Sequence, residues 1–158
     1  MLRFIFCFIS ITAIAQTEKN YQKLKDQQGR IQSEGWMLNG LKTDYWINYF
    51  PNEFIASKGH FKAGVKEKYW YFYQVNHNLK KEGHFSLGQM SGWWIFYDNK
   101  GALSYKCQYI KNRKEGYCIW YKKKKIIKIE KYKAGVKIGE WKDLKSFELE
   151  NNIDDLLK

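Results

Sequence analysis

Bulky hydrophobic side chains recur along this chain with a regular period. The stretch 59–73 reads GHFKAGVKEKYWYFY, the stretch 35–49 before it reads GWMLNGLKTDYWINY, and the stretch 83–97 after it reads GHFSLGQMSGWWIFY. Two further copies, at 107–121 and 133–141, read CQYIKNRKEGYCIWY and KAGVKIGEW. Because all the copies lie in one sequence, they predict one structural unit built five times.

Each copy carries the same order of columns. An aromatic residue or Met comes first, Gly or Asn follows three positions later, and Trp or Cys lies six positions after that. The first column is Met37, Phe61, Phe85, Tyr109 and Tyr132; the second is Gly40, Gly64, Gly88, Asn112 and Gly135; the third is Trp46, Trp70, Trp94, Cys118 and Trp141.

The unit is predicted to be a β-hairpin, because Gly or Asn separates two short runs rich in Tyr, Trp, Phe and Ile. Asn39-Gly40 is typical of a type I′ turn, in which both central residues have positive φ. The repeats show no helical period. The expected fold is therefore all-β, an elongated antiparallel β-meander of about five hairpins or ten strands. Turns are expected near Asn39-Gly40, Ala63-Gly64, Leu87-Gly88, Lys111-Asn112 and Ala134-Gly135.

Strand alternation divides the side chains between two faces of the sheet. In the second copy Gly59, Phe61 and Trp70 share one face, where the glycine leaves room for a ring to lie on the backbone. The opposite face carries a double ladder of amphipathic rings that could bind a partner; the alternative is ordinary cross-strand pairing of half-exposed rings. The ladder consists of Tyr45, Tyr69, Trp93 and Tyr117, with Tyr49, Tyr73, Tyr97 and Tyr121 four residues further on.

Both ends of the chain fall outside the predicted repeat domain, 29–145. Residues 1–15 have a basic start, an apolar run and an Ala13-Ile14-Ala15 exit, which is typical of a cleaved secretory signal. The expected product is exported, as a periplasmic or secreted protein; the alternative is a core strand or an anchor. Residues 16–28 are expected to be a polar leader, either mobile or a short helix. Residues 146–158 are expected to form a capping helix with Ser146 as N-cap, or a tail.

The chain is strongly basic, with a formal charge of +12 at pH 7. Such a charge attracts acidic partners, including anionic lipid or acidic glycan. The alternative is that lysine keeps the exposed edges of a one-layer sheet soluble. Lysine greatly outnumbers arginine, the usual residue for bidentate phosphate recognition, and nucleic acid is therefore not the expected partner.

Two cysteines, Cys107 and Cys118, remain after residue 15, and both lie in the fourth copy. An uninterrupted hairpin places Cys107 opposite Gly116, so that the two cysteines are diagonal neighbours on one face. An exported protein could join them in a disulfide. The alternative is two small side chains in the space that Gly and Trp occupy in other copies.

The residues offer little for catalysis. His60 and His84 share a column, but successive hairpins are about 9.6 Å apart, too far for two ligands of one metal ion. No nucleophile elbow, phosphate loop or Cys-x-x-Cys occurs. We therefore expect no enzyme activity, no metal and no cofactor, and histidines that pack beside the Tyr column.

The spacing of Gly59, Phe61 and Gly64, repeated at Gly83, Phe85 and Gly88, resembles the MORN repeat. Gly92 with Trp94, Gly116 with Cys118 and Gly139 with Trp141 resemble the G-x-W ending of bacterial MORN-variant repeats, some of which are described as antitoxin-like. The resemblance covers residues 29 to about 144. It implies a β-meander that serves as a binding surface or scaffold for a protein or cell-envelope partner. Two other functions are alternatives: that of an antitoxin-like protein, and that of a protein that binds an anionic membrane surface or an acidic glycan by electrostatic attraction.

Overall fold

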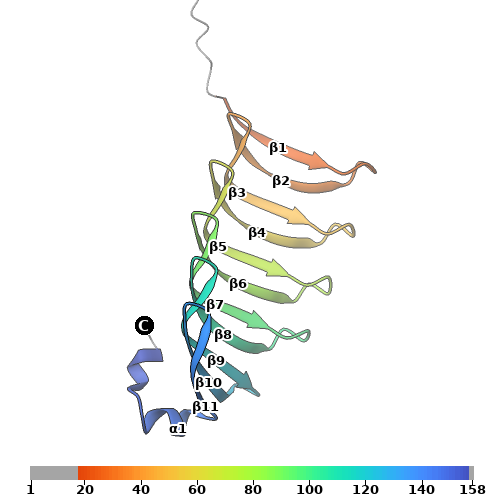
Figure 1. The fold of residues 1–158 in the computed structure, drawn as a ribbon. Coiled ribbons are helices and arrows are strands. Elements are labelled where there is room, and N and C mark those ends of the chain that lie inside the picture. Colours follow the sequence, from red (N-terminus) through yellow and green to blue (C-terminus); the bar gives the residue numbers. More distant parts are fainter. Residues whose placement is uncertain (1–17, 157–158) are drawn as a thin grey trace, which may run out of the picture.

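The chain forms a single open antiparallel sheet of eleven strands, which pair in the order of the sequence in this computed structural model (Figure 1). The structure describes residues 18–156, so the predicted signal sequence lies outside the described residues. The all-β meander of repeated hairpins is confirmed. Its strands are β1 (Lys19–Lys25), β2 (Ile31–Leu38), β3 (Leu41–Tyr49), β4 (Ile55–Lys62), β5 (Val65–Tyr73), β6 (Leu79–Ser86), β7 (Gln89–Tyr97), β8 (Leu103–Ile110), β9 (Arg113–Lys122), β10 (Lys125–Lys133) and β11 (Val136–Trp141).

The five expected hairpin turns lie where the sequence predicts them. Both residues of each turn have positive φ, from 48° at Ala63 to 85° at Gly135, as a type I′ turn requires. The last four turns also join successive hairpins, because the second turn residue donates its backbone N–H to the preceding hairpin, as Gly64 does to the carbonyl of Lys42 at 2.8 Å. Such a turn therefore closes its own hairpin and contacts the one before it.

The polar leader is not a helix or a mobile segment over its whole length. Lys19–Lys25 forms β1, which pairs with β2 and supplies the first edge of the sheet. Its residues are largely exposed, and Tyr21 and Leu24 are its only bulky apolar side chains, so its hydrophobic pattern is weak. Backbone pairing with β2 holds the segment in the sheet, together with the contact of the Tyr21 and Trp36 rings and the ion pair of Lys23 with Glu34.

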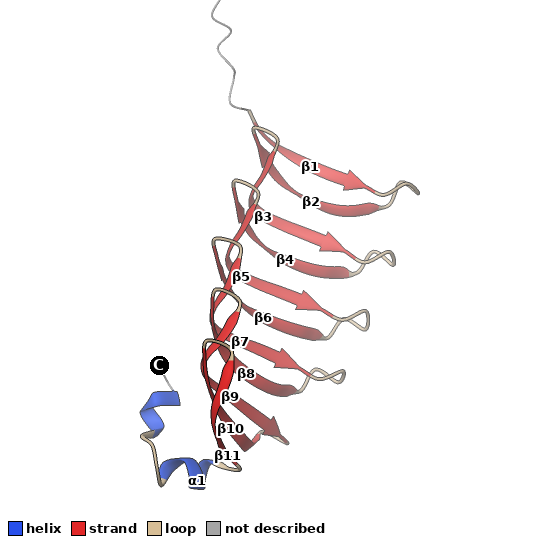
Figure 2. Ribbon diagram, in the orientation of Figure 1, coloured by secondary structure: helices blue, strands red, loops and turns tan. Residues whose placement is uncertain are grey.

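A repeated β-bulge interrupts every hairpin and changes the register that the turns alone predict. Where β4 pairs with β5, His60 lies opposite Glu67 and the next pair is Gly59 with Trp70. Lys68 and Tyr69 are therefore two extra residues of β5 between these pairs. The first bulge residue has positive φ in the first four copies: 53° at Asp44, 61° at Lys68, 68° at Gly92 and 93° at Gly116. Bulges bend a strand and increase its twist. The sheet is accordingly curved along each strand, not flat (Figures 1 and 2).

The bend defines an inner and an outer face. Lys66 and Phe72 are six positions apart on β5, which is about 20 Å in a straight strand, yet the Lys66 Nζ lies 5.1 Å from the Phe72 ring centroid. These two side chains therefore meet inside the bend. We call this the inner face, and it carries the Gly and Trp columns; the outer face carries Tyr45 and its equivalents.

The fifth hairpin departs from the other four. Its bulge adds only Ile138, between the pairs Lys131 with Gly139 and Tyr132 with Lys137. Trp141 consequently pairs with Ile129 on the outer face, and its predicted place in the inner Trp column is wrong. The sequence spacing concealed this change, because one residue lost from the bulge moves every later side chain to the opposite face.

A short C-terminal cap covers the outer face at this end of the sheet. Helix α1 (Leu144–Glu148) is followed by the 3-10 helix Ile153–Leu156. The N-cap of α1 is Asp143 and not Ser146, which instead completes a capping box at the third helical position. Phe147 is fully buried against Tyr117 and Trp141, with ring centroids 5.5 and 5.0 Å away. No helix among residues 18–156 is long and apolar enough to cross a membrane.

Candidate binding surfaces

The outer face carries a ladder of rings set edge to face. Tyr45 packs against His60 with ring centroids 5.1 Å apart and planes 73° apart, and Tyr69 repeats the contact with His84 at 4.9 Å and 84°. The two histidines therefore lie beside the Tyr column, as expected, and each has its own tyrosine. Edge-to-face packing of this kind fixes the rings in place.

A column of alternating charge runs beside this ladder, formed by Glu34, Lys58, Glu82 and Lys106. The second Tyr column reaches back to it: the Tyr49 hydroxyl donates to Glu34 at 2.6 Å, and the Tyr97 hydroxyl donates to Glu82. The same spacing brings Lys58 to 5.6 Å from the Tyr73 ring. The first three tyrosines of this column are thus each held to a charged group on the preceding strand.

These contacts set the protonation of the outer face. Burial, followed by the hydrogen bond to Glu34, raises the pKa of Tyr49 to about 12. Burial and the charge of Glu82 raise the pKa of Tyr69 to about 12 as well. The hydrogen bond from Tyr49 holds the pKa of Glu34 below its ordinary value. At neutral pH Tyr49 is therefore an uncharged donor and Glu34 is an anionic acceptor.

The C-terminal cap removes part of the predicted ladder from solvent. Tyr117 is only 6% exposed and belongs to the small core with Ile119, Ile129 and Phe147, and Tyr121 packs against that core. Trp93 also contacts it. The open part of the outer face is thus formed mainly by the first two hairpins, where Tyr45 is 38% exposed. Periodicity could not distinguish covered from open copies, because the covering segment is not part of the repeat.

The inner face is built on three fully buried tryptophans, Trp46, Trp70 and Trp94. Each ring lies over a glycine on the neighbouring strand; a Cβ on Gly59 would lie 2.3 Å from the Trp70 ring. The Trp70 indole N–H donates to the carbonyl of His60 at 3.0 Å and to that of Glu67 at 3.2 Å, on either side of the bulge. The tryptophan therefore satisfies carbonyl groups that the bulge removes from regular strand pairing.

In the fourth hairpin a disulfide replaces the Gly and Trp pair. The bulge places Cys107 directly opposite Cys118 with their Cα atoms 4.0 Å apart, and the two sulfur atoms are bonded. The diagonal arrangement expected from an uninterrupted hairpin is wrong because that register omits the two extra residues of β9. The two cysteines are fully buried at the centre of the bend.

Lysines recur on the inner face among the rings. The Lys42 Nζ lies 4.0 Å from the Trp46 ring centroid, and the Lys66 Nζ lies 4.6 Å from that of Trp70. Lys81 lies between Phe72 at 5.0 Å and Trp94 at 5.3 Å. Burial lowers the pKa of all three lysines. These lysines were not selected from the sequence, although Lys42, Lys66 and Lys114 follow the period of the repeat and could have been found by it.

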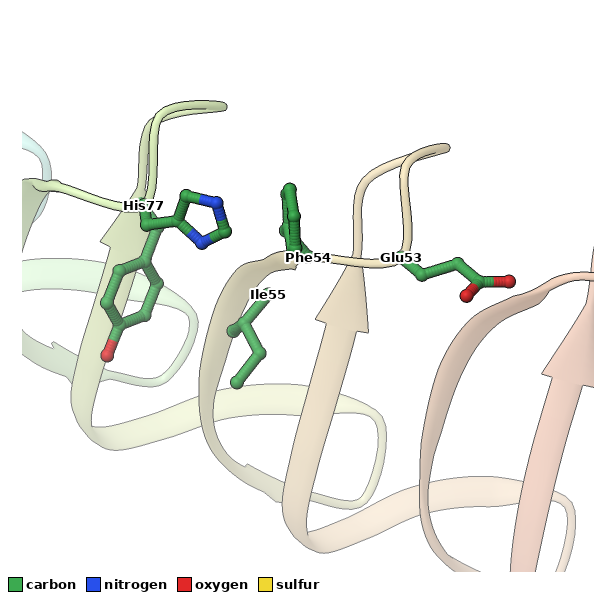
Figure 3. Close-up of a pocket in the computed structure, with 5 residues that line it drawn as sticks. Glu53, Phe54, Ile55 and His77 are labelled. Atoms are coloured by element: carbon green, nitrogen blue, oxygen red, sulfur yellow. The ribbon is translucent and has the colours of Figure 1, made fainter.

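The connectors between hairpins form a small open pocket at the edge of the sheet (Figure 3). The rings of Phe54 and His77, from successive connectors, lie 3.7 Å apart at their centroids. Glu53 points away from His77, so the pocket brings together no acid and base pair. Within residues 18–156 no group of three or more His, Cys, Asp or Glu side chains could hold a metal ion.

Comparison with known proteins leaves the repeat pattern as the basis for classification. The chain matches no protein-family model and no curated protein sequence. The resemblance to MORN repeats accordingly stays a prediction from the residues.

Proposed function

We propose that this chain is a non-catalytic, exported repeat protein of the MORN-like kind that binds a protein or cell-envelope partner through its outer face. The observation that carries the proposal is the open ladder Tyr45, His60, Tyr69 and His84, bordered by alternating charges. Rings with an apolar body and a polar tip are the side chains that dominate binding energy in protein interfaces.

The ladder is ordered before any partner arrives. Edge-to-face contacts hold its rings, and hydroxyl groups of the second Tyr column are tied to Glu34 and Glu82. A surface with fixed side chains loses little conformational entropy on binding. The alternating charges would pair with complementary charges on a partner. Such a pattern favours specific binding over general electrostatic attraction.

The test uses the double variant Tyr45→Ala/Tyr73→Ala, which removes rings from the open part of the outer face. Its matched control is Val75→Ala/Leu87→Ala, which removes exposed apolar groups from a connector and a turn. Circular dichroism checks that both variants fold. The expected result is that the tyrosine variant loses a partner captured from a cell-envelope fraction, while the control retains it. Equal capture by both variants would contradict the outer face as the binding surface.

Export is tested separately by cell fractionation of the full-length protein. Mature protein beginning near Gln16 in the periplasm or medium is expected from the signal-like residues 1–15. Full-length protein confined to the cytoplasm would contradict export and would make a cytoplasmic partner the one to seek.

A further inference from the structure

We propose that the inner face is a second binding site, for an extended acidic polysaccharide whose sugars carry carboxylates. It rests on inner-face lysines and on a groove that shares only Tyr73 with the outer-face residues named above, and it does not depend on the function proposed above. The inner face combines a concave shape, a row of ring side chains and an excess of positive charge.

Lysine is the main charged residue of the inner face. Within residues 18–156, Glu130 and the residue paired with it, Glu140, are inner-face carboxylates at the C-terminal end of the sheet, where Lys128 and Lys137 form ion pairs with them. Among the described residues, Lys42, Lys66 and Lys81 have no ion pair with a carboxylate; they lie over aromatic rings instead. An acidic ligand would supply the counter-charges that the fold leaves out.

Partial burial strengthens this argument. The ammonium groups of Lys66 and Lys81 lie among aromatic rings in a partly apolar setting, which weakens their hydration and lowers the pKa of both. A carboxylate placed there meets cations that are fixed by ring contacts and screened less than surface lysines.

The shape of the inner face suits a narrow chain. An open groove of about 520 Å³ follows one side of the bend and is lined by rings of Phe72, Phe96 and Tyr105 together with Lys81. Phe96 and Tyr105 are stacked with centroids 4.4 Å apart, and Trp120 continues the stack at 4.4 Å from Tyr105. Sugar rings present C–H groups that pack on such aromatic surfaces, and their carboxylates would reach the lysines.

The repeat also sets a spacing between lysines along the inner face. Equivalent lysines on successive hairpins, such as Lys42 and Lys66, are two strands apart, or about 9.6 Å. This matches an extended acidic glycan with one carboxylate on every second sugar. Successive phosphates of a single nucleic acid strand are closer together, and lysine lacks the planar fork that arginine offers to phosphate. A flat membrane surface cannot reach charges that lie inside a bend.

The experiment compares two double variants of the full mature chain. Lys66→Met/Lys81→Met removes two inner charges but keeps linear apolar stems over the rings. Lys62→Met/Lys100→Met removes two exposed lysines from a turn edge and a connector and serves as the matched control. The probe is a hexasaccharide in which glucuronic acid alternates with N-acetylglucosamine, with a neutral hexasaccharide beside it. Binding is measured by calorimetry and by the fluorescence of the tryptophans that form the floor of the inner face.

The wild-type protein is expected to bind the acidic hexamer and not the neutral one at low salt. The inner variant should weaken binding about tenfold, equal to about 1.4 kcal/mol, while the control and the single outer-face variant Tyr45→Ala bind as wild type. Equal weakening in the control would show attraction by net charge alone and would overturn the site. Absence of binding to the acidic hexamer, or tighter binding to an oligothymidylate or to phosphatidylglycerol vesicles, would overturn the choice of ligand.

Discussion

A single glycine decides whether each inner tryptophan can lie flat against the sheet. An ideal Cβ on Gly59 would lie 2.3 Å from the Trp70 ring, which is already fully buried and hydrogen-bonded at its indole nitrogen. Gly59→Ala is therefore expected to lower the free energy of unfolding by about 3 kcal/mol, because the ring must leave its place. Urea unfolding followed by circular dichroism measures the change.

Gly92→Asn is the control for that substitution. Gly92 has open space around its Cα and a φ of 68°, and Asp44 and Lys68 adopt positive φ at the equivalent position in other hairpins. Asparagine tolerates this conformation, so the cost should stay below about 1 kcal/mol. If Gly59→Ala proved as mild as Gly92→Asn, the close approach of Trp70 to its glycine would not be needed for stability.

Glu130 makes the stability of the last hairpins depend on pH. Its side chain accepts hydrogen bonds from Trp120 at 2.8 Å, Lys128 at 3.0 Å and Tyr132 at 3.2 Å. Burial alone would raise the pKa of Glu130, but these donors outweigh it and the pKa lies below its ordinary value. Because the folded state prefers the carboxylate, its contribution is present above the unfolded pKa and is lost as the pH falls through the folded one.

Glu130→Gln tests this dependence. At pH 7 it should cost about 2 kcal/mol of unfolding free energy, since a charged acceptor of three donors is replaced by a neutral amide. At pH 3 the difference from wild type should shrink. Urea unfolding at both pH values measures it, with the exposed Glu148→Gln as control. A difference that stays constant between pH 7 and pH 3 would contradict the assigned charge state.

At the level of the hairpin, the turns and the strand ladder were predictable but the bulge was not. Turn residues such as Asn39-Gly40 have a chemistry tied to positive φ. The first bulge residue is Asp44, Lys68, Gly92 or Gly116, and these share a backbone conformation but no side-chain type. Only the glycines of the third and fourth copies, Gly92 and Gly116, hinted at it. Missing the bulge placed Cys107 opposite the wrong residue.

The turn prediction leads to a direct test at Gly88. This residue has a φ of 75° in the turn between β6 and β7, and its added Cβ would lie 3.0 Å from the Val65 side chain. Gly88→Val should destabilise the protein by about 2 kcal/mol, because a β-branched residue is strained at positive φ. Gly88→Asn should be nearly neutral, since Asn112 fills the same position in the next hairpin with a φ of 66°. Thermal unfolding distinguishes the two variants, and equal melting temperatures would contradict the argument.

The cap is the element that the repeat pattern could not place. Its hydrophobic residues were visible in the sequence. Its docking on the outer face, however, depends on Ile129, which lies in the last hairpin at the position that a charged residue takes in the earlier hairpins. Phe147→Ala should cost about 3 kcal/mol, because it empties a fully buried site between Tyr117 and Trp141. Leu149→Ala, at a residue 81% exposed, should change the unfolding free energy little. Similar losses for both would show that the cap does not depend on Phe147.

Across the whole molecule, each hairpin is stabilised mainly by contacts with the hairpins next to it in the sequence. Strands pair with their sequence neighbours, so a perturbation in one hairpin reaches distant hairpins only through those between them. The first three hairpins are closed by Gly and Trp packing, the fourth by a covalent bond and the fifth by the cap. The two ends of the sheet should therefore respond differently to a reducing agent.

Reduction of the Cys107 to Cys118 bond is the test of that independence. The bond closes a separation of 11 residues, and its loss should cost about 3 kcal/mol by the chain-entropy argument. Hydrogen exchange followed by mass spectrometry should then speed up in β8 and β9 and in the capped strands beyond them, while β3 to β5 keep their protection. Cys107→Ser/Cys118→Ser should reproduce the reduced pattern without added reductant. Equal acceleration along the entire sheet would instead show that the eleven strands unfold as one cooperative unit.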